Sequence, residues 1–308
     1  MKIVFMGNPQ FAVPSLRKLV KSDHDVLSVV TNPPKPAGRG KKLINSPVAV
    51  CAKELNLPII EADDLKSEKI LHSLKELKAD IFAVVAYRIL PKIVISIPTK
   101  GAINLHGSLL PKYRGAAPIQ WALIKGETET GLTTFIIQPK VDRGNILLQK
   151  TITIEPEDDY GSLAEKMSHS GAELLVDTLD RFENENVVPL KQVESNVTLA
   201  PKIAPAFTNI NWKKSANEIH NLIRGLAPSP GAKTVLDEKR LKIFKTKFIE
   251  EDSTLNTGEI SNIEKETFSV QTGKGQLVVV EVQLEGKRRM SAGDFLRGVQ
   301  LDIGQILS

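Results

Sequence analysis

The first 140 residues alternate short, continuously apolar runs with segments of helical periodicity. Runs that are apolar on both faces are typical of parallel strands that helices cover on each side. The predicted strands are 2–6, 26–30, 81–86 and 102–106, and the predicted helices are 12–21, 47–56 and 67–77. The pattern therefore indicates an α/β fold with a mostly parallel sheet.

The pattern changes after residue 130. Two predicted strands, 133–138 and 146–154, are joined by a short loop that contains Pro and Gly, which is typical of a hairpin added to the sheet. A long helix then runs from Tyr160 to about Phe182. Residues 185–207 lose the helical period and contain three prolines, which indicates a linker along the surface.

Beyond the linker, one predicted helix precedes a series of short strands separated by turn residues, and this pattern predicts a small closed β-barrel. The helix is expected near 215–224 and the strands near 232–236, 240–248, 257–262, 267–271 and 276–284. A chain of 308 residues suits two domains. We predict an α/β domain over 1–188, a linker over 189–206 and the barrel domain over 207–308.

Composition and motifs exclude several classes of protein. Apolar residues make up 41% of the chain and charged residues 25%, as in ordinary globular proteins. The single cysteine, Cys51, cannot form an internal disulfide, and the N-terminus reads as a strand and not as a signal peptide, so we expect a cytoplasmic protein. No apolar run is long enough to span a membrane. The absence of Gly-x-Gly-x-x-Gly, P-loop and metal-ligand spacings argues against a nicotinamide cofactor, nucleotide hydrolysis and a metal.

The positive charge of the chain is unevenly distributed. The net charge is +5, and residues 33–42 contain four basic side chains and no acidic one: Lys35, Arg39, Lys41 and Lys42. Such a loop permits a polyanionic partner. A solvated basic loop without a partner is the alternative.

Two polar side chains occur where a buried strand ends. Asn104 and His106 are two residues apart, so they point to the same face of the strand, and Ile103 and Leu105 point to the other. Gly107 then lets the chain turn at the sheet edge where α/β proteins bind ligands. A histidine exchanges protons near neutral pH, and an adjacent amide can stabilise a carbonyl oxygen that becomes negative. A structurally satisfied histidine and an asparagine turn cap are the alternatives.

A third polar residue, Asp142, lies in the hairpin loop 36 residues after His106. If the two side chains meet, the carboxylate can fix the imidazole tautomer or position a water molecule. A turn aspartate is the alternative. Their spacing in the sequence does not decide between these interpretations.

These motifs resemble those of the folate-dependent formyltransferases, and the resemblance covers nearly the whole chain. The matching segments are Gly7–Ala12, Pro36–Lys42, Asn104–Pro111, Gly115–Gln120 and Asp142–Gly144. The resemblance implies a Rossmann-like formyltransferase domain followed by an OB-like β-barrel. It also implies transfer of the formyl group of 10-formyltetrahydrofolate, bound as a substrate, without a metal.

The resemblance further implies roles for individual residues. Asn104 and His106 would stabilise the oxyanion, and Asp142 would orient His106 and assist proton transfer. The folate would contact Tyr87, Arg88, Ser108, Leu109, Leu110 and Pro111. The basic residues Arg39, Lys41 and Lys42, together with the barrel, would bind tRNA, so the expected acceptor is the α-amine of methionyl initiator tRNA.

The chain departs from the family pattern at two positions near the expected folate pocket. Arg88 stands where the family commonly has Gly, and Arg143 stands where a small residue is common. One alternative function is formyl transfer to a small amine, such as an amino sugar or glycinamide ribonucleotide, or to water. A second alternative is a non-catalytic RNA-binding protein. The two-domain layout requires no partner subunit, so we expect a monomer.

Overall fold

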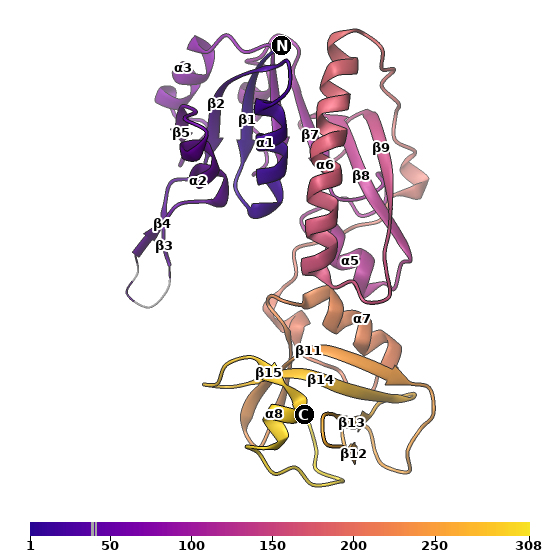
Figure 1. Ribbon diagram of the computed structural model, residues 1–308. Helices are drawn as coiled ribbons and strands as arrows, with labels where there is room; N and C mark the ends of the chain where they lie inside the picture. Colours follow the sequence, from indigo (N-terminus) through magenta and orange to yellow (C-terminus); the bar gives the residue numbers. More distant parts are fainter. Residues whose placement is uncertain (38–39, 41) are drawn as a thin grey trace. The chain divides into compact units, whose positions relative to one another are not determined.

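The structure is a computed structural model that describes residues 1–37, 40 and 42–308. Packing divides the chain into two units, coloured along the sequence in Figure 1. The N-terminal unit comprises residues 1–115, 130–153 and 164–200, and the C-terminal unit comprises 116–129, 154–163 and 201–308. The domain boundaries drawn from the sequence at residues 188 and 207 stay a prediction.

A seven-stranded sheet forms the centre of the N-terminal unit, in the order β5-β2-β1-β6-β7-β8-β9. The strands are β1 (Lys2–Gly7), β2 (Asp25–Thr31), β5 (Ile59–Glu61), β6 (Ile81–Val85), β7 (Ala102–His106), β8 (Glu129–Ile136) and β9 (Ile146–Thr153). The five neighbouring strands β5, β2, β1, β6 and β7 pair in parallel, and β8 runs antiparallel to β7. The predicted mostly parallel sheet with an added pair of strands is confirmed.

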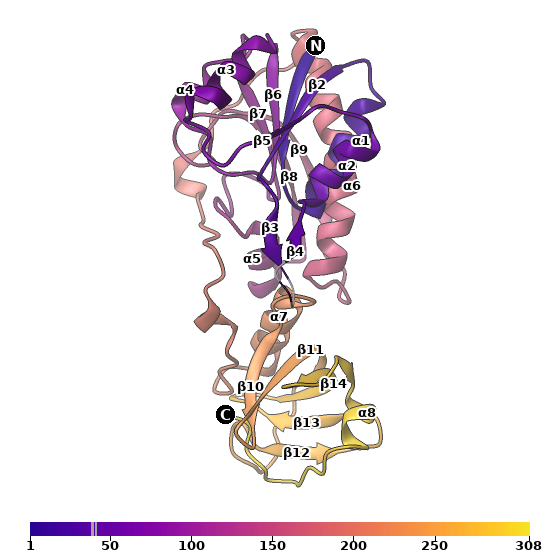
Figure 2. The ribbon, with the colours of Figure 1, turned by 90° about the vertical axis from the view of Figure 1, so that its left-hand side faces the viewer.

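Helices cover both faces of this sheet (Figure 2). The helices on one face are α3 (Glu68–Glu76) and α4 (Lys92–Ile95); those on the other are α1 (Val13–Val20), α2 (Pro47–Glu54) and α6 (Tyr160–Glu183), with the 3₁₀ turn η1 (Gln10–Ala12) before α1. Ala102 of β7 packs with α3 and α4, whereas Leu105 lies under Gly171 of α6. Alternation along β7 therefore places Asn104 and His106 on the α3 side. No helix among the described residues is long and apolar enough to cross a membrane.

The basic segment differs from the loop that the sequence pattern indicated. Strands β3 (Lys35–Ala37) and β4 (Lys42–Ile44) pair antiparallel and form a ribbon. Leu43 and Ile44 of β4 are exposed, so no core packing produces the alternation of apolar and polar residues that identifies a strand in a sequence. The part of this segment that the structure describes is therefore paired backbone.

Antiparallel strands form the second sheet, in the C-terminal unit. The strands are β10 (Ala232–Leu236), β11 (Lys239–Ile249), β12 (Ile260–Ile263), β13 (Phe268–Gln271), β14 (Gln276–Leu284) and β15 (Met290–Ser291), and the order is β10-β11-β14-β13-β12 with β15 beside β14. Ser308 exchanges backbone hydrogen bonds with Val235 of β10, and Gln305 accepts one from Ile260 of β12. The last residues thus bridge the two edge strands, which confirms the predicted small barrel and gives the means of its closure.

The helix α7 begins with a capping box that its sequence encodes. Ser215 accepts a hydrogen bond from the backbone amide of Glu218, and the Glu218 carboxylate accepts one from the Ser215 amide. A hydrogen bond from the Ser215 hydroxyl to the Glu218 carboxylate, and then the one from the Ser215 amide, lower the pKa of Glu218. The helices of this unit are α5 (Pro118–Ile124), α7 (Ala216–Leu226) and α8 (Ala292–Leu296); the remaining 3₁₀ turns of the chain are η2 (Glu194–Asn196) and η3 (Pro205–Thr208).

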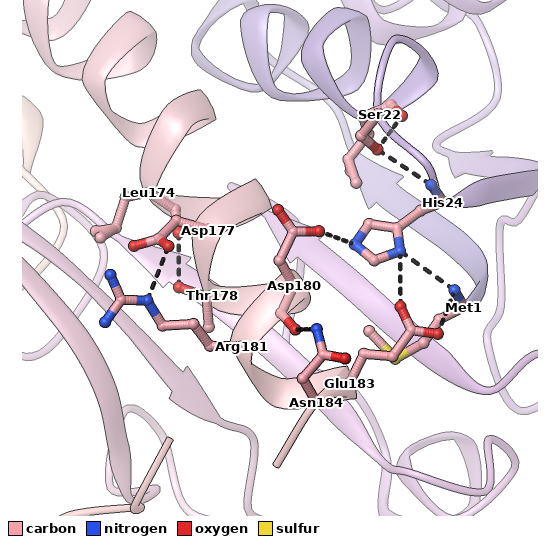
Figure 3. Close-up of polar contacts among 11 residues, drawn as sticks. Met1, Ser22, His24, Leu174, Asp177, Thr178, Asp180, Arg181, Glu183 and Asn184 are labelled. Carbon is pink, nitrogen blue, oxygen red and sulfur yellow. Dashed lines mark hydrogen bonds and ion pairs between the residues drawn. The ribbon is translucent and has the colours of Figure 1, made fainter. Parts of the chain in front are cut away.

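A buried histidine links the start of the parallel sheet to the end of α6 (Figure 3). His24 Nδ1 lies 3.2 Å from the Met1 amine, and His24 Nε2 lies 3.1 Å from Asp180 Oδ1. The Met1 ammonium also pairs with Glu183 at 3.0 Å. Because an ammonium group can only donate, Nδ1 accepts and the ring proton lies on Nε2, toward Asp180. Burial, and then the nearby ammonium, lower the pKa of His24 against the opposing pull of the carboxylates.

We expect His24→Gln to reduce the loss of stability on acidification. The folded-state pKa of His24 lies below its unfolded value of about 6.5, so its contribution is complete above about pH 6.5 and is lost as the pH falls through the folded-state value. Thermal unfolding from pH 7.5 to pH 5 should show the Tm of the wild type falling more than that of the variant. His72→Gln, at an exposed position on α3, is the control. A Tm difference that is independent of pH would contradict this role.

Candidate active site

Strand β7 ends at a buried histidine whose ring is held on one side. The His106 ring packs edge-on against Phe135, with centroids 6.5 Å apart. His106 Nε2 lies 3.0 Å from the carbonyl oxygen of Tyr113. A carbonyl oxygen can only accept, so Nε2 carries a proton. Nδ1 is therefore the ring nitrogen that remains for proton transfer.

The structure brings Asp142 to this free nitrogen. Asp142 lies in the loop between β8 and β9, and its Oδ2 is 3.9 Å from His106 Nδ1. That separation is an ion-pair distance and is longer than a hydrogen bond. The same oxygen accepts a hydrogen bond of 2.9 Å from the Gly115 amide, which fixes the carboxylate. A proton arriving at Nδ1 would thus face a fixed negative charge.

Two glycines allow the loops around Asp142 to approach the rest of the site. A Cβ at Gly144 would lie 1.6 Å from the carbonyl oxygen of Ile136, and one at Gly115 would lie 2.5 Å from that of Ala200. Gly115 also has a φ of +130°, which a side chain disfavours. Both positions therefore require glycine, and both glycines belong to motifs that the sequence singled out.

Asn104 is fixed by its position in a central strand. Its backbone pairs with Val84 of β6 and Phe135 of β8, and its side chain is half-buried on the face that also carries His106. Within the described ranges, the side-chain amide of Asn104 forms no hydrogen bond to another residue. The amide is thus placed to donate to a bound ligand.

Hydrogen bonds within the loop and to β8 hold the segment that follows β7. Ser108 donates to a carbonyl oxygen of its own loop at 2.6 Å, and the Leu110 amide donates to Thr133 Oγ1 at 3.0 Å. Ser108 and Leu110 are buried, whereas Leu109 and Pro111 are half-buried. All four were expected to contact folate. Ser108 and Leu110 support the loop, whereas Leu109 and Pro111 expose surface that a ligand can contact.

The departures from the family pattern both have partners within the chain. The Arg88 guanidinium donates to the carbonyl oxygens of Ala62 and Asp63 and to the Tyr87 hydroxyl, so it secures the loop after β5. Burial raises the pKa of Tyr87. Arg143 is half-exposed, with Nη1 3.9 Å from a carboxylate oxygen of Glu194.

The expected tRNA-binding residues are only partly described. Lys42 is exposed on β4 of the ribbon. Arg39 and Lys41 lie outside the described residues.

One segment beside the site was missed by reasoning from the sequence. Residues 190–200, read as part of a surface linker, return to the loop that follows β7: the Arg114 amide donates to the Thr198 carbonyl oxygen, and the Ala200 amide donates to the Arg114 carbonyl oxygen. The segment has no periodic apolar pattern, so no signal in the sequence indicated this contact.

Taken together, the site combines an amide donor and an imidazole on one strand with a carboxylate from a neighbouring loop. An amide donor stabilises an oxyanion, and an imidazole next to a carboxylate can accept and return a proton. These are the groups needed to transfer an acyl-type carbon to a nucleophile through a tetrahedral intermediate.

Solved structures of proteins named as formyltransferases share this fold. An N-formyltransferase from Helicobacter canadensis, in complex with folinic acid and dTDP-3-aminofucose, matches 94% of this chain and all of its own, with a TM-score of 0.68 and 22% identity. A methionyl-tRNA formyltransferase from Clostridium thermocellum matches 80% of this chain and 93% of its own, with a TM-score of 0.57 and 16% identity. At these identities the similarity shows the fold alone.

Sequence comparison places the chain more closely. Residues 1–179 match the formyl transferase family, and residues 202–300 match the formyl transferase C-terminal domain. The methionyl-tRNA formyltransferase of Pelotomaculum thermopropionicum is 43% identical over 100% of this chain and 98% of its own length. That of Geobacter metallireducens is 42% identical over 99% and 97%. The chain therefore belongs to the formyl transferase family and, within it, to the methionyl-tRNA formyltransferases.

Proposed function

We propose that this protein transfers the formyl group of 10-formyltetrahydrofolate to the α-amine of methionine esterified to initiator tRNA, giving formylmethionyl-tRNA for translation initiation. The observation that carries the proposal is the convergence of Asn104, His106 and Asp142 at the end of β7. Full-length relatives that bear the name of this activity support the choice of acceptor.

The amide of Asn104 serves the first step, in which the amine attacks the formyl carbon. The amine must be unprotonated, and esterification of the methionine removes the neighbouring carboxylate, which lowers the amine pKa below the ordinary value of about 7.7–8.0. As the new C–N bond forms, the formyl oxygen becomes negative. A donor fixed on a strand stabilises that charge without having to reorient.

His106 and Asp142 carry out the proton transfer. With Nε2 bonded to Tyr113, Nδ1 takes the proton from the attacking amine, or donates it to the oxyanion once the ring is charged. Asp142, 3.9 Å away, balances the imidazolium charge. When the bond between the formyl carbon and the folate nitrogen breaks, the proton passes to that nitrogen.

The choice of acceptor is assigned to the basic ribbon. Arg39→Glu is expected to raise the KM for methionyl-tRNA about tenfold or more while leaving the KM for the folate nearly unchanged, because it reverses one of the positive charges that favour binding to phosphates. Lys69→Glu, the same reversal at an exposed position on α3, is the control. Steady-state kinetics with each substrate varied in turn would measure both constants. Equal losses toward both substrates would contradict the assignment.

The proposed reaction is tested by combining the purified protein, 10-formyltetrahydrofolate and methionyl initiator tRNA. Formylmethionyl-tRNA should accumulate, and neither free methionine nor uncharged tRNA should be formylated. An amino sugar nucleotide, the kind of ligand present in the Helicobacter canadensis structure, tests the second function as the acceptor. Formylation of that amine without formylation of the charged tRNA would overturn the proposal.

We further infer a cytoplasmic monomer that needs no metal. The two-domain layout requires no partner subunit, and each group given a role above acts through a proton or a hydrogen bond. Cys51 is buried and burial raises the pKa of its thiol, which fits a packing role in a reducing compartment. Size-exclusion chromatography with light scattering would test the monomer. Activity after treatment with a chelator would test the independence from metal.

A further inference from the structure

A buried arginine and glutamine lie behind the Asp142 loop. The side chains of Arg114 and Gln192 are 4% and 5% exposed. Arg114 Nε and Nη2 both donate to Gln192 Oε1, at 3.0 Å and 2.7 Å. Gln192 Nε2 donates to the carbonyl oxygens of Asp142, at 2.9 Å, and Gly144, at 2.8 Å. Since guanidinium groups only donate and carbonyl oxygens only accept, these contacts fix the orientation of the glutamine amide.

The neighbours of Arg114 in the chain hold the two reacting side chains. The carbonyl oxygen of Tyr113 accepts from His106 Nε2, and the amide of Gly115 donates to Asp142 Oδ2. Three consecutive residues thus fix the site. Tyr113 holds the imidazole, Arg114 holds the backbone of the Asp142 loop through Gln192, and Gly115 holds the Asp142 carboxylate. The separation of 3.9 Å between His106 Nδ1 and Asp142 Oδ2 depends on this tripeptide.

Burial makes this arrangement specific. A buried guanidinium costs free energy unless its donors are satisfied, and Gln192 faces it with a neutral acceptor. Glu194, which is mostly exposed, accepts from Nη1 and Nη2 on the solvent side, at 3.2 Å and 3.0 Å, and Arg114 lowers the pKa of its carboxyl group. Among the residues that the structure describes, the carboxylate that pairs with Arg114 is thus at the surface, and an amide lies between the guanidinium and the Asp142 loop.

We propose that Arg114 and Gln192 are positioning residues that hold the Asp142 loop at the working distance from His106. The proposal rests on the proposed function, because it needs His106 and Asp142 to act as a pair. Displacement of a reacting group by about 1 Å can cost on the order of 100-fold in rate. The segment that carries Gln192 then supports catalysis through the position of the Asp142 loop.

The test compares Gln192→Glu with Gln192→Ala. Glutamate keeps the size and the acceptor for Arg114 but has no donor for the two loop carbonyl oxygens. We expect both variants to lose on the order of 10- to 100-fold in kcat, with KM for both substrates changed less than threefold. The pH profile of the single-turnover rate should also shift in both, because the His106–Asp142 pair is displaced. Ser195→Ala, exposed on the same segment, is the control.

Two results would overturn the positioning role. One is Gln192→Glu with wild-type kcat and pH profile, because Arg114 alone would then be the partner that matters. The other is a loss of activity in proportion to unfolded protein, with an unchanged pH profile in the folded fraction. Failure of the proposed function is distinct, because the wild type itself would then not formylate methionyl-tRNA.

Discussion

Replacing Asn104 with alanine is expected to lower kcat by roughly 10²- to 10³-fold, the range found when one oxyanion donor is removed. The Asn104 amide lies on the same face of β7 as His106 and forms no hydrogen bond within the described ranges. Its loss should therefore affect the transition state more than the bound substrates. KM for the folate and for methionyl-tRNA should change little.

Single-turnover formylation with saturating enzyme would measure this effect without contribution from product release. Asn104→Asp keeps the shape of the side chain but replaces the donor with a negative charge, so it should be at least as slow as Asn104→Ala. Circular dichroism and thermal unfolding would establish that the strand remains folded. A single-turnover rate within threefold of the wild type in both variants would rule out Asn104 as the oxyanion donor.

The second large effect is expected at Asp142. Asp142→Asn keeps an oxygen that can accept from the Gly115 amide, so the loop should hold its position, but it removes the charge 3.9 Å from His106 Nδ1. We expect kcat to fall about 100-fold or more, because a proton on Nδ1 is no longer balanced. Asp142→Ala should be slower still, since it also releases the Gly115 amide.

A matched control separates this effect from a general change in charge. Asp177→Asn removes the same charge from the surface of α6, where the pair with Arg181 contributes little. Single-turnover rates from pH 6 to pH 9 should show Asp142→Asn slow throughout and Asp177→Asn like the wild type. Wild-type rates in Asp142→Asn would mean that His106 works without the carboxylate.

The parts of the fold that the sequence predicted are those whose burial leaves a pattern. Strands β1, β2, β6 and β7 are covered on both faces and appear as continuous apolar runs, so their bounds were found to within one residue. β5 has only three residues, and β3 and β4 lie outside the core, so none of them leaves a periodic signal. β8 begins at Glu129, four residues before the predicted start, in a stretch that contains polar Glu129 and Thr130.

The candidate site was predictable to the extent that it is local. Alternation along one strand was enough to place Asn104 and His106 on the same face. The approach of Asp142 depends on how two loops fold together, and only the family resemblance suggested it. The contact of Arg114 with Gln192 joins side chains 78 positions apart, and neither hydrophobic period nor motif spacing encodes such a hydrogen bond.

The contact of residues 190–200 with the loop after β7 determines which fragments of the protein keep the candidate site whole. A fragment that ends with α6 at Glu183, or at residue 179 where the family match stops, would keep Asn104, His106 and Asp142 but lose Gln192 and the backbone partners of Arg114. A fragment that extends through Ala200 would keep them all. An isolated catalytic domain should therefore be expressed with the whole connecting segment, and a protease nick near Glu185 would disconnect part of the site from the helix before it.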